Sequence, residues 1–136
     1  MDKGVGVGLG SDVSGGPNPF MPESGRQAIV ASLALDHGVN PDLPPKTRGR
    51  GEGRIDFRQA FWLLTAGGAN ALDLPLGRFA PGCQFDALVI DVNAPHSNVK
   101  IWPDFDSDED ILQKIFYNAA RADITQVWVA GRKVKG

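Results

Sequence analysis

A short apolar segment that runs directly into a glycine-rich turn constrains this chain more than any other feature. The segment begins at Val5 and the turn ends at Pro17, with Asp12 inside it. Glycine adopts backbone conformations that are closed to other residues, so the turn can be tight and a ligand can approach it closely. We therefore expect a strand that presents Asp12 at its carboxyl end, where parallel α/β folds collect ligands and catalytic groups.

Three interpretations of this turn compete. In the first, the Asp12 carboxylate hydrogen-bonds its own loop, as aspartate often does in turns. In the second, the turn cradles a phosphate, but no position satisfies the Gly-x-Gly-x-x-Gly spacing, which excludes this interpretation. In the third, Ser14 is a nucleophile, because residues 12–17 resemble the Asp-Ser-Gly-Gly-Pro of trypsin-like proteases. The inserted Val13 breaks that spacing, and no histidine lies upstream to act as the base.

Composition restricts the class of protein. The 136 residues suit one domain, and a formal net charge of −2 with 42% apolar residues argues against a nucleic-acid-binding basic protein and against a disordered one. The lone Cys83 excludes an internal disulfide and suits a reducing compartment such as the cytoplasm. No apolar run approaches the roughly 20 residues of a membrane span, and we expect no signal peptide. Because the apolar strand follows Met1 almost directly, we expect that an N-terminal portion is missing.

The first half of the chain is predicted to be helical. A helix is expected over residues 23–36 with Gly38 as its stop, and His37 is interpreted as favouring the helix C-terminus rather than binding a metal. Residues 40–54, which are rich in proline, glycine and basic side chains, predict a mobile loop. Asp56 and Gln59 have the spacing of a reciprocal helix cap, and the helix that follows is expected to end at the two glycines 67 and 68.

The composition changes to a β type near residue 74, where we place a domain boundary. Strands are expected near residue 79 and over residues 84–91, and a hairpin over residues 124–134 turns at Ala130-Gly131. Ser107 and Asp110 repeat the capping spacing before a helix with an apolar face. His96 stands among turn-forming residues and is interpreted as a surface residue, and Trp102 and Trp128 are interpreted as packing groups.

Several stretches together resemble the guanine deaminases, a family of the metal-dependent amidohydrolase superfamily. The resemblance covers nearly the whole chain. Its middle stretches are general to the superfamily, whereas the glycine-rich turn and the helix near residue 113 resemble guanine deaminases more narrowly. The stretches are Gly8-Leu-Gly-Ser-Asp-Val-Ser-Gly-Gly16, Leu64-Thr-Ala-Gly-Gly-Ala-Asn-Ala-Leu72, Gly77-Arg-Phe79 through Phe85-Asp-Ala-Leu-Val-Ile90, Ile111-Leu-Gln-Lys-Ile-Phe-Tyr117 and Val127-Trp-Val-Ala-Gly-Arg-Lys-Val134.

The resemblance implies an α/β fold: residues 1–73 would be the last strand and helices of a (β/α)8 barrel, and residues 74–136 the C-terminal part of a small β-rich domain with one helix. It implies zinc-dependent hydrolysis of guanine to xanthine and ammonia, with Asp12 as a metal ligand and proton acceptor. It also implies a homodimer of the full-length enzyme, with no nucleic-acid or membrane partner.

The family's four histidine ligands have no counterpart here, because the chain has two histidines and neither matches. The basic loop that ends at Arg54 also departs from the family pattern. We therefore expect that this chain is inactive alone. The alternative is a non-catalytic truncated or interaction module derived from an amidohydrolase.

Overall fold

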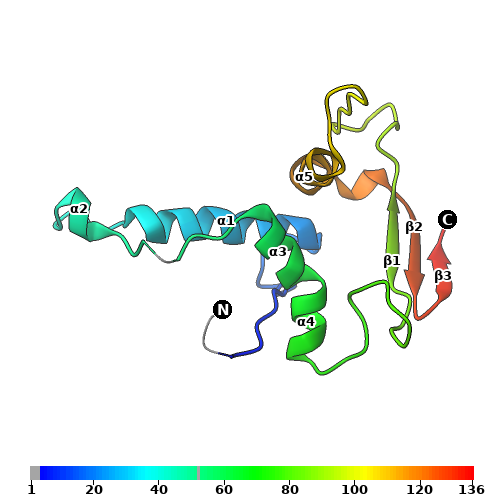
Figure 1. Ribbon diagram of the computed structural model, residues 1–136, viewed down its shortest axis with the longest axis horizontal. Coiled ribbons are helices and arrows are strands. Elements are labelled where there is room, and N and C mark those ends of the chain that lie inside the picture. Colours follow the sequence, from blue (N-terminus) through cyan, green and yellow to red (C-terminus); the bar gives the residue numbers. More distant parts are fainter. Residues whose placement is uncertain (1–3, 52) are drawn as a thin grey trace. The chain divides into compact units, whose positions relative to one another are not determined.

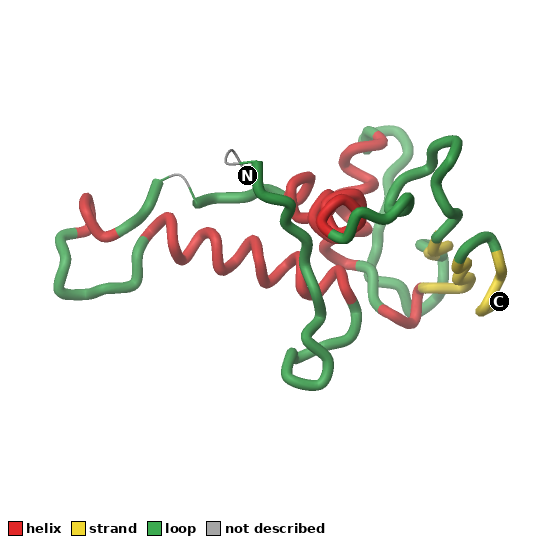
Figure 2. The backbone as a smooth tube through the Cα atoms, turned by 90° about the horizontal axis from the view of Figure 1, so that it is seen from below, coloured by secondary structure: helices red, strands yellow, loops and turns green. Residues whose placement is uncertain are grey.

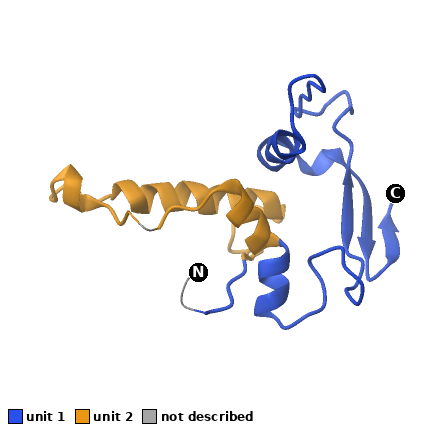
Figure 3. Ribbon diagram, in the orientation of Figure 1, with its two compact units in different colours: residues 1–8, 65–136 blue, residues 9–64 orange. Residues whose placement is uncertain are grey.

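A computed structural model describes residues 4–51 and 53–136 (Figure 1). The chain divides into two compact units, one of residues 9–64 and one of residues 65–136 with the described part of 1–8 (Figure 3). Much of the chain between the regular elements runs as loop (Figure 2). The elements in chain order are α1 (Met21–His37), α2 (Pro45–Arg48), α3 (Phe57–Leu64), α4 (Ala66–Ala71), β1 (Ala87–Ile90), α5 (Asp108–Asn118), the 3-10 helix η1 (Arg121–Asp123), β2 (Ile124–Val129) and β3 (Arg132–Lys135).

The long helix α1 confirms the helix expected over residues 23–36. It ends at Gly38, whose φ of +78° favours glycine, and the Gly38 amide donates to the carbonyl of Ala34 at 2.8 Å. Its buried face is narrow, because Ile29 is buried while the neighbouring Val30 is 65% exposed. The buried Ser32 hydroxyl accepts from the amide of Ile55 at 3.1 Å, which ties α1 to the segment before α3.

The short helix α3 packs against α1 and begins with the expected reciprocal cap. The amide of Gln59 donates to Oδ1 of Asp56 at 2.9 Å, and the amide of Asp56 donates to Oε1 of Gln59 at 3.0 Å. The bond from the Gln59 amide is the main reason that the pKa of Asp56 is lowered. The buried side chains of α3 are Phe57, Ala60 and Leu63.

The expectation that two glycines end this helix is wrong. The helix ends at Leu64 because Thr65 leaves the helical region, with φ −122° and ψ −100°. The glycines at 67 and 68 instead lie inside α4, where Gly67 is buried. Glycine has a low helix propensity, so α4 forms although two of its six residues disfavour a helix.

The basic loop is more ordered locally than its composition suggested. Its middle forms the single turn α2, and the Arg48 guanidinium donates to the carbonyl oxygens of Leu43 at 2.8 Å and of Pro41 at 3.3 Å. The amide of Arg50 donates to the carbonyl of Leu35 on α1 at 2.9 Å. Glu52, within the predicted mobile range, lies outside the described residues. The mobility of the loop stays a prediction.

The sheet is small and antiparallel, with the strand order β1-β2-β3. It confirms the strand expected over residues 84–91, although β1 is shorter, and it confirms the closing hairpin. Ala130 and Gly131 form the turn with φ of +48° and +77°. The strand expected near residue 79 is not formed, since residues 77–82 contain only bends, turns and irregular backbone. Phe79 instead contacts Phe85, with ring centroids 5.6 Å apart, and Phe85 meets Trp128 edge-on at 5.9 Å.

The helix α5 begins at the capping box expected from its sequence. The Asp110 amide donates to Oγ of Ser107 at 3.2 Å, and the Ser107 amide donates to Oδ2 of Asp110 at 3.0 Å. The Ser107 hydroxyl, which also donates to this carboxylate, lowers the pKa of Asp110. On its apolar face Phe116 is buried, as is Ala119 directly after the helix.

Large apolar side chains remain exposed in both units. Examples are Val5 at 68%, Phe61 at 40% and Phe105 at 85% exposure. A chain that leaves this much apolar surface open has fewer core contacts than a closed domain of its size. Within the described part of the chain, no helix combines the length and the apolar character that crossing a bilayer requires.

Candidate functional site

The glycine-rich turn after residue 9 presents Asp12 to solvent. The segment that leads to it is tied to α3, because the amide of Leu9 donates to the carbonyl of Leu63 at 3.1 Å. Asp12 has a φ of +49°, and its carbonyl oxygen accepts from the amide of Gly16. A left-handed φ is tolerated by aspartate better than by most residues. The turn therefore closes on the backbone of Asp12 and leaves its side chain exposed.

Two glycines make room for this turn. A Cβ atom at Gly16 would overlap the carbonyl oxygen of Ser11, so no other residue fits there without a shift of the backbone. A Cβ atom at Gly15 would lie 3.0 Å from Oδ2 of Asp12. Gly10, by contrast, has nothing within 4 Å of the same position. The glycines at 15 and 16 therefore allow the backbone to pass close to the carboxylate.

The expectation that Asp12 follows a strand is wrong for the chain as the structure describes it. Residues 4–12 contain no strand. A strand requires a neighbouring strand for its N–H and C=O groups, and the bond from Leu9 goes to a helical residue instead. The three strands that the described residues do form all lie in the antiparallel sheet after residue 86. Asp12 is consequently positioned by the Leu9–Leu63 bond and by its own turn.

The described residues offer one potential metal ligand at this turn and no complete metal site. Across residues 4–51 and 53–136, no group of three or more His, Cys, Asp or Glu side chains is placed to hold a metal ion. An exposed carboxylate such as Asp12 suits a divalent cation as one ligand, but zinc sites ordinarily use at least three protein ligands. Among the described residues of this turn, Asp12 could therefore supply one ligand to a metal ion, and the other ligands are lacking.

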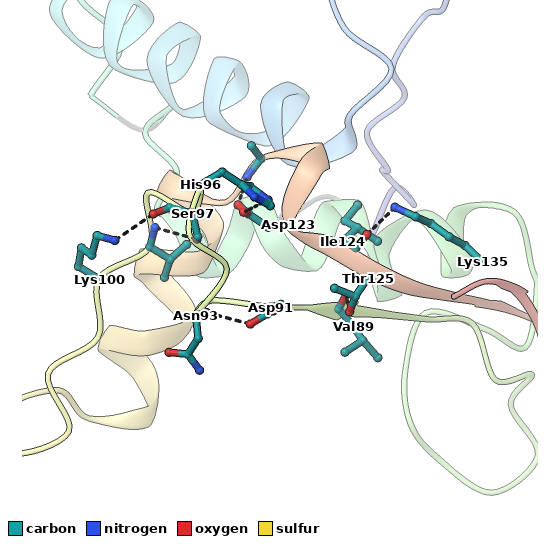
Figure 4. A network of polar contacts seen from close by, with 12 residues as sticks. Val89, Asp91, Asn93, His96, Ser97, Lys100, Asp123, Ile124, Thr125 and Lys135 are labelled. Carbon is teal, nitrogen blue, oxygen red and sulfur yellow. Dashed lines mark hydrogen bonds and ion pairs between the residues drawn. The ribbon is translucent and has the colours of Figure 1, made fainter.

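Both histidines make contacts within their own units. Nδ1 of His37 contacts the carbonyl oxygen of Leu33 at 2.8 Å, which supports the expected role at the end of α1. The His96 side chain is 56% exposed, as a surface residue should be, but its Nε2 also lies 3.4 Å from Oδ1 of Asp123. Asp123, which is 1% exposed and lies beside His96 (Figure 4), is not singled out by the sequence. Its Oδ2 accepts from the amide of Ala120 at 2.8 Å, and an alanine at the N-cap gives no capping signal in the sequence.

A cavity of about 300 Å³ lies beside α5, but its charged groups are paired with one another. Nζ of Lys114 lies 2.7 Å from Oδ1 of Asp106, and this bond lowers the pKa of the Asp106 carboxyl. The Asp110 carboxylate belongs to the capping box of α5. These paired carboxylates are therefore not available as a general acid or base, and the Asp12 turn remains the stronger candidate for a functional site. The lining residues are Asp106, Asp110, Gln113, Lys114, Tyr117 and Asn118.

The chain is similar in sequence and in structure to known proteins. The Amidohydrolase family matches residues 1–134. A probable guanine deaminase of Schizosaccharomyces pombe is 34% identical over 139 residues, which cover 100% of this chain and 24% of that protein. The guanine deaminase of Mus musculus is 34% identical over 136 residues, covering 96% of this chain and 28% of that protein. The structure of E. coli guanine deaminase aligns with a TM-score of 0.69 at 25% identity, over 96% of this chain and 27% of that one.

The chain thus spans about a quarter of the length of these relatives. The matched region nevertheless takes in almost every described element, from the turn that holds Asp12 to the hairpin of β2 and β3.

Proposed function

Because this chain belongs to the amidohydrolase family, we propose that it provides the Asp12 carboxylate to a guanine deaminase, which hydrolyses guanine to xanthine and ammonia. The exposed position of Asp12 in a turn that two glycines keep close carries this proposal. Likeness to guanine deaminases along nearly the whole chain supports the choice of substrate. The proposed activity is that of a complete enzyme, to which these 136 residues contribute one part.

Asp12 has two roles in this proposal. Its carboxylate would be one ligand of a zinc ion, and it would accept the proton of the attacking water at a carboxylate oxygen. Zinc, when bound, makes water acidic enough to act as a nucleophile near neutral pH. The exposure of the side chain supports both roles, because the carboxylate is open to a ligand. The other ligands and the groups that grip the purine would come from residues outside this chain.

The two histidines take no part in this chemistry. His37 is engaged with the end of α1, and His96 lies beside Asp123. A single carboxylate does not hold zinc tightly. The isolated 136 residues should therefore release no ammonia from guanine.

The proposal divides the chain between residues 73 and 74. Residues 1–73 would belong to the last unit of a (β/α)8 barrel, and residues 74–136 to a small β-rich domain that contains the antiparallel sheet. The alignment with E. coli guanine deaminase over 96% of this chain supports a fold shared with part of that enzyme. We also infer a homodimer of the complete enzyme and a location in the cytoplasm, a reducing compartment that suits the lone Cys83.

A chimera tests the proposal. The matching segment of E. coli guanine deaminase is replaced by these 136 residues, and ammonia release from guanine is measured together with zinc content. We expect turnover by the chimera, and a loss of about 10²- to 10⁴-fold on Asp12→Ala, as is typical when general acid–base catalysis is removed. Zinc content should fall as well, because a ligand is lost.

Asp104→Ala is the matched control, because Asp104 is an exposed aspartate on a loop outside the glycine-rich turn. This variant should keep near-normal turnover and zinc. Near-normal turnover by the Asp12→Ala chimera, in a folded protein that retains zinc, would reject the role of Asp12. Robust turnover by the isolated chain would reject the requirement for further residues.

The second candidate is a non-catalytic module derived from an amidohydrolase. The incomplete metal site among the described residues favours it. The chimera separates the two candidates, since a module that has lost the catalytic geometry would give a folded chimera without turnover.

A further inference from the structure

Two short segments of the chain carry opposite charge. Residues 105–110, the acidic segment, contain four acidic side chains and no basic one. Residues 46–50, the basic segment, contain three basic side chains and no acidic one. The chain as a whole is close to neutral, with a formal net charge of −2. Every copy of the chain therefore carries two surfaces of opposite sign, which favours attraction between copies.

The acidic segment begins with an exposed aromatic side chain on a fixed turn. Phe105 is 85% exposed, and the nearby Trp102 is 55% exposed. The amides of Phe105 and Asp106 both donate to the carbonyl oxygen of Trp102 at 2.9 Å. Oδ2 of Asp106 accepts from the amide of Trp102 at 2.8 Å, and its Oδ1 accepts from Nζ of Lys114 at 2.7 Å. An exposed aromatic group on a fixed turn is suited to anchor an interface, because little ordering is needed on binding.

The carboxylates of the acidic segment differ in their engagement. Asp106 pairs with Lys114, and Asp110 belongs to the capping box of α5. Asp108 and Glu109 lie in the first turn of α5, and both are exposed. These two side chains therefore place negative charge on the surface that follows the aromatic turn.

The basic segment is fixed against the end of α1. The Arg48 guanidinium donates to the carbonyl oxygen of Leu43 at 2.8 Å, and the amide of Arg50 donates to the carbonyl oxygen of Leu35 at 2.9 Å. Arg48 is thus used to hold the turn. The side chains of Lys46 and Arg50 are exposed, and they place positive charge on this surface.

Exposed apolar side chains accompany the basic segment. Leu35 is 54%, Val39 is 79% and Leu43 is 43% exposed. The hydrogen bonds of Arg48 and Arg50 tie the first and last of these residues to the basic segment. Both surfaces therefore combine exposed apolar groups with charge, and the charges are opposite. Protein interfaces commonly join an apolar centre to a polar rim, and complementary charges select the partner.

We propose that the acidic segment of one copy docks on the basic segment of a second copy, with Phe105 packing on the exposed leucines and valine there. The occupant is a second copy because the chain itself supplies both complementary surfaces. Two copies can make two equivalent contacts, as closed dimers do. The contact is weak and salt-sensitive, since each exposed ion pair contributes little and salt screens it.

This contact specifies an interface for the homodimer inferred above, and it rests on that part of the proposed function. Its test measures association between copies and no turnover. A negative result therefore leaves the role of Asp12 untouched.

Sedimentation equilibrium of the 136-residue chain tests the contact. We expect reversible dimers whose dissociation constant rises roughly tenfold between about 0.1 M and 1 M salt, as the Debye length falls from about 10 Å to 3 Å. At the lower salt, Lys46→Glu combined with Arg50→Glu should raise the dissociation constant roughly tenfold, because attraction becomes repulsion. Asp108→Lys combined with Glu109→Lys should have a similar effect for the same reason.

A mixture of the two charge-reversed chains provides the decisive arm. Each contact in the mixed dimer again joins opposite charges, so the mixture should recover most of the parental affinity. Arg132→Glu combined with Lys133→Glu is the matched control, because it makes the same charge change on the exposed strand β3 and should leave association unchanged. Circular dichroism checks that each chain is folded.

The aromatic anchor has its own control. Phe105→Ala should weaken association without any change of charge. Phe79→Ala removes another highly exposed aromatic side chain, 79% exposed and outside both segments, and should have no effect. A parent chain that stays monomeric at its highest soluble concentration, undiminished association of the charge-reversed chains, or a mixture no tighter than either reversed chain alone would each overturn the proposal.

Discussion

The amide of Leu9 donates to the carbonyl oxygen of Leu63 at 3.1 Å, which joins the segment before the Asp12 turn to the last residues of α3. This bond fixes the start of the turn, as a neighbouring strand would in a sheet. We expect Leu9→Pro, which removes the donor, to speed exchange of the Gly16 amide by about two- to tenfold, the range for one net hydrogen bond. Leu9→Ala keeps the donor and is the control. Equal effects of the two variants would show that the Leu9 side chain, not its amide, positions the turn.

Gly16 should be irreplaceable in the turn. A Cβ atom there overlaps the Ser11 carbonyl oxygen, so Gly16→Ala must move the backbone beside Asp12. Overpacking of this kind costs about 1–3 kcal/mol. In the chimeric deaminase we expect at least a tenfold loss of turnover. Gly10→Ala, in the same segment but with open space around it, should keep normal turnover. If both alanine variants behave alike, the close turn is not required.

Acid should loosen the start of α5. The pKa of Asp110 is lowered by its bond from Ser107, and the pKa of Asp106 is lowered by its bond from Lys114. A depressed carboxyl pKa contributes stability above the ordinary value, near 3.9, and that stability is lost as the pH falls through the lowered values. Exchange at the Asp110 amide should therefore accelerate below about pH 4.

Ser107→Ala removes the cap of α5 directly. At neutral pH we expect exchange of the Asp110 amide to become about fivefold faster, which corresponds to the usual worth of an N-cap. The acid effect at that amide should shrink in the same variant, because the bond that lowers the Asp110 pKa is gone. Tyr117, on the last turn, provides a reporter that neither change should affect. An undiminished acid effect at Asp110 would contradict this assignment.

The local order of the basic loop should depend on the hydrogen bonds of Arg48 rather than on the loop's positive charge. The guanidinium holds the turn at two carbonyl oxygens, of Leu43 and of Pro41. We expect Arg48→Ala to speed exchange of the Thr47 amide by roughly two- to tenfold. Lys46→Ala removes a positive charge from the exposed side of the same turn and should have little effect. Strong protection throughout the loop in the Arg48 variant would overturn both this role and the predicted mobility.

The elements that sequence predicts well are those whose signals are local. Asp56 and Gln59 form the cap of α3, and Ser107 and Asp110 form the cap of α5. Both pairs have the spacing of a capping box in the sequence, so the sequence predicts where each helix begins. The hairpin is equally local, because its turn residues stand between two segments that each contain β-branched residues. A helix boundary set by the backbone of Thr65, rather than by the glycines after it, gave no such signal.

Strand pairing and burial depend on residues far apart in the chain, and there the sequence is weaker. The apolar segment from Val5 has the composition of a strand but no strand neighbour among the described residues. Asp12 could be singled out because its glycines and its family resemblance coincide, while its catalytic role stays a prediction. Asp123 could not, since its burial is produced by the loop that folds over it from residues 91–99.

The two edge strands of the sheet, β1 and β3, differ in the charge of their side chains. Along β3, the side chains of Arg132, Lys133 and Lys135 place like charges where a further chain would have to approach. Along β1, residues 87–90 are uncharged, and Asp86 and Asp91 stand just beyond its ends. Charged edge strands resist aggregation and apolar ones invite it. When the chain is produced by itself, aggregation should therefore begin by pairing between the β1 edges of two copies. The substitution Val89→Lys should reduce this aggregation, because it places a charge on that edge.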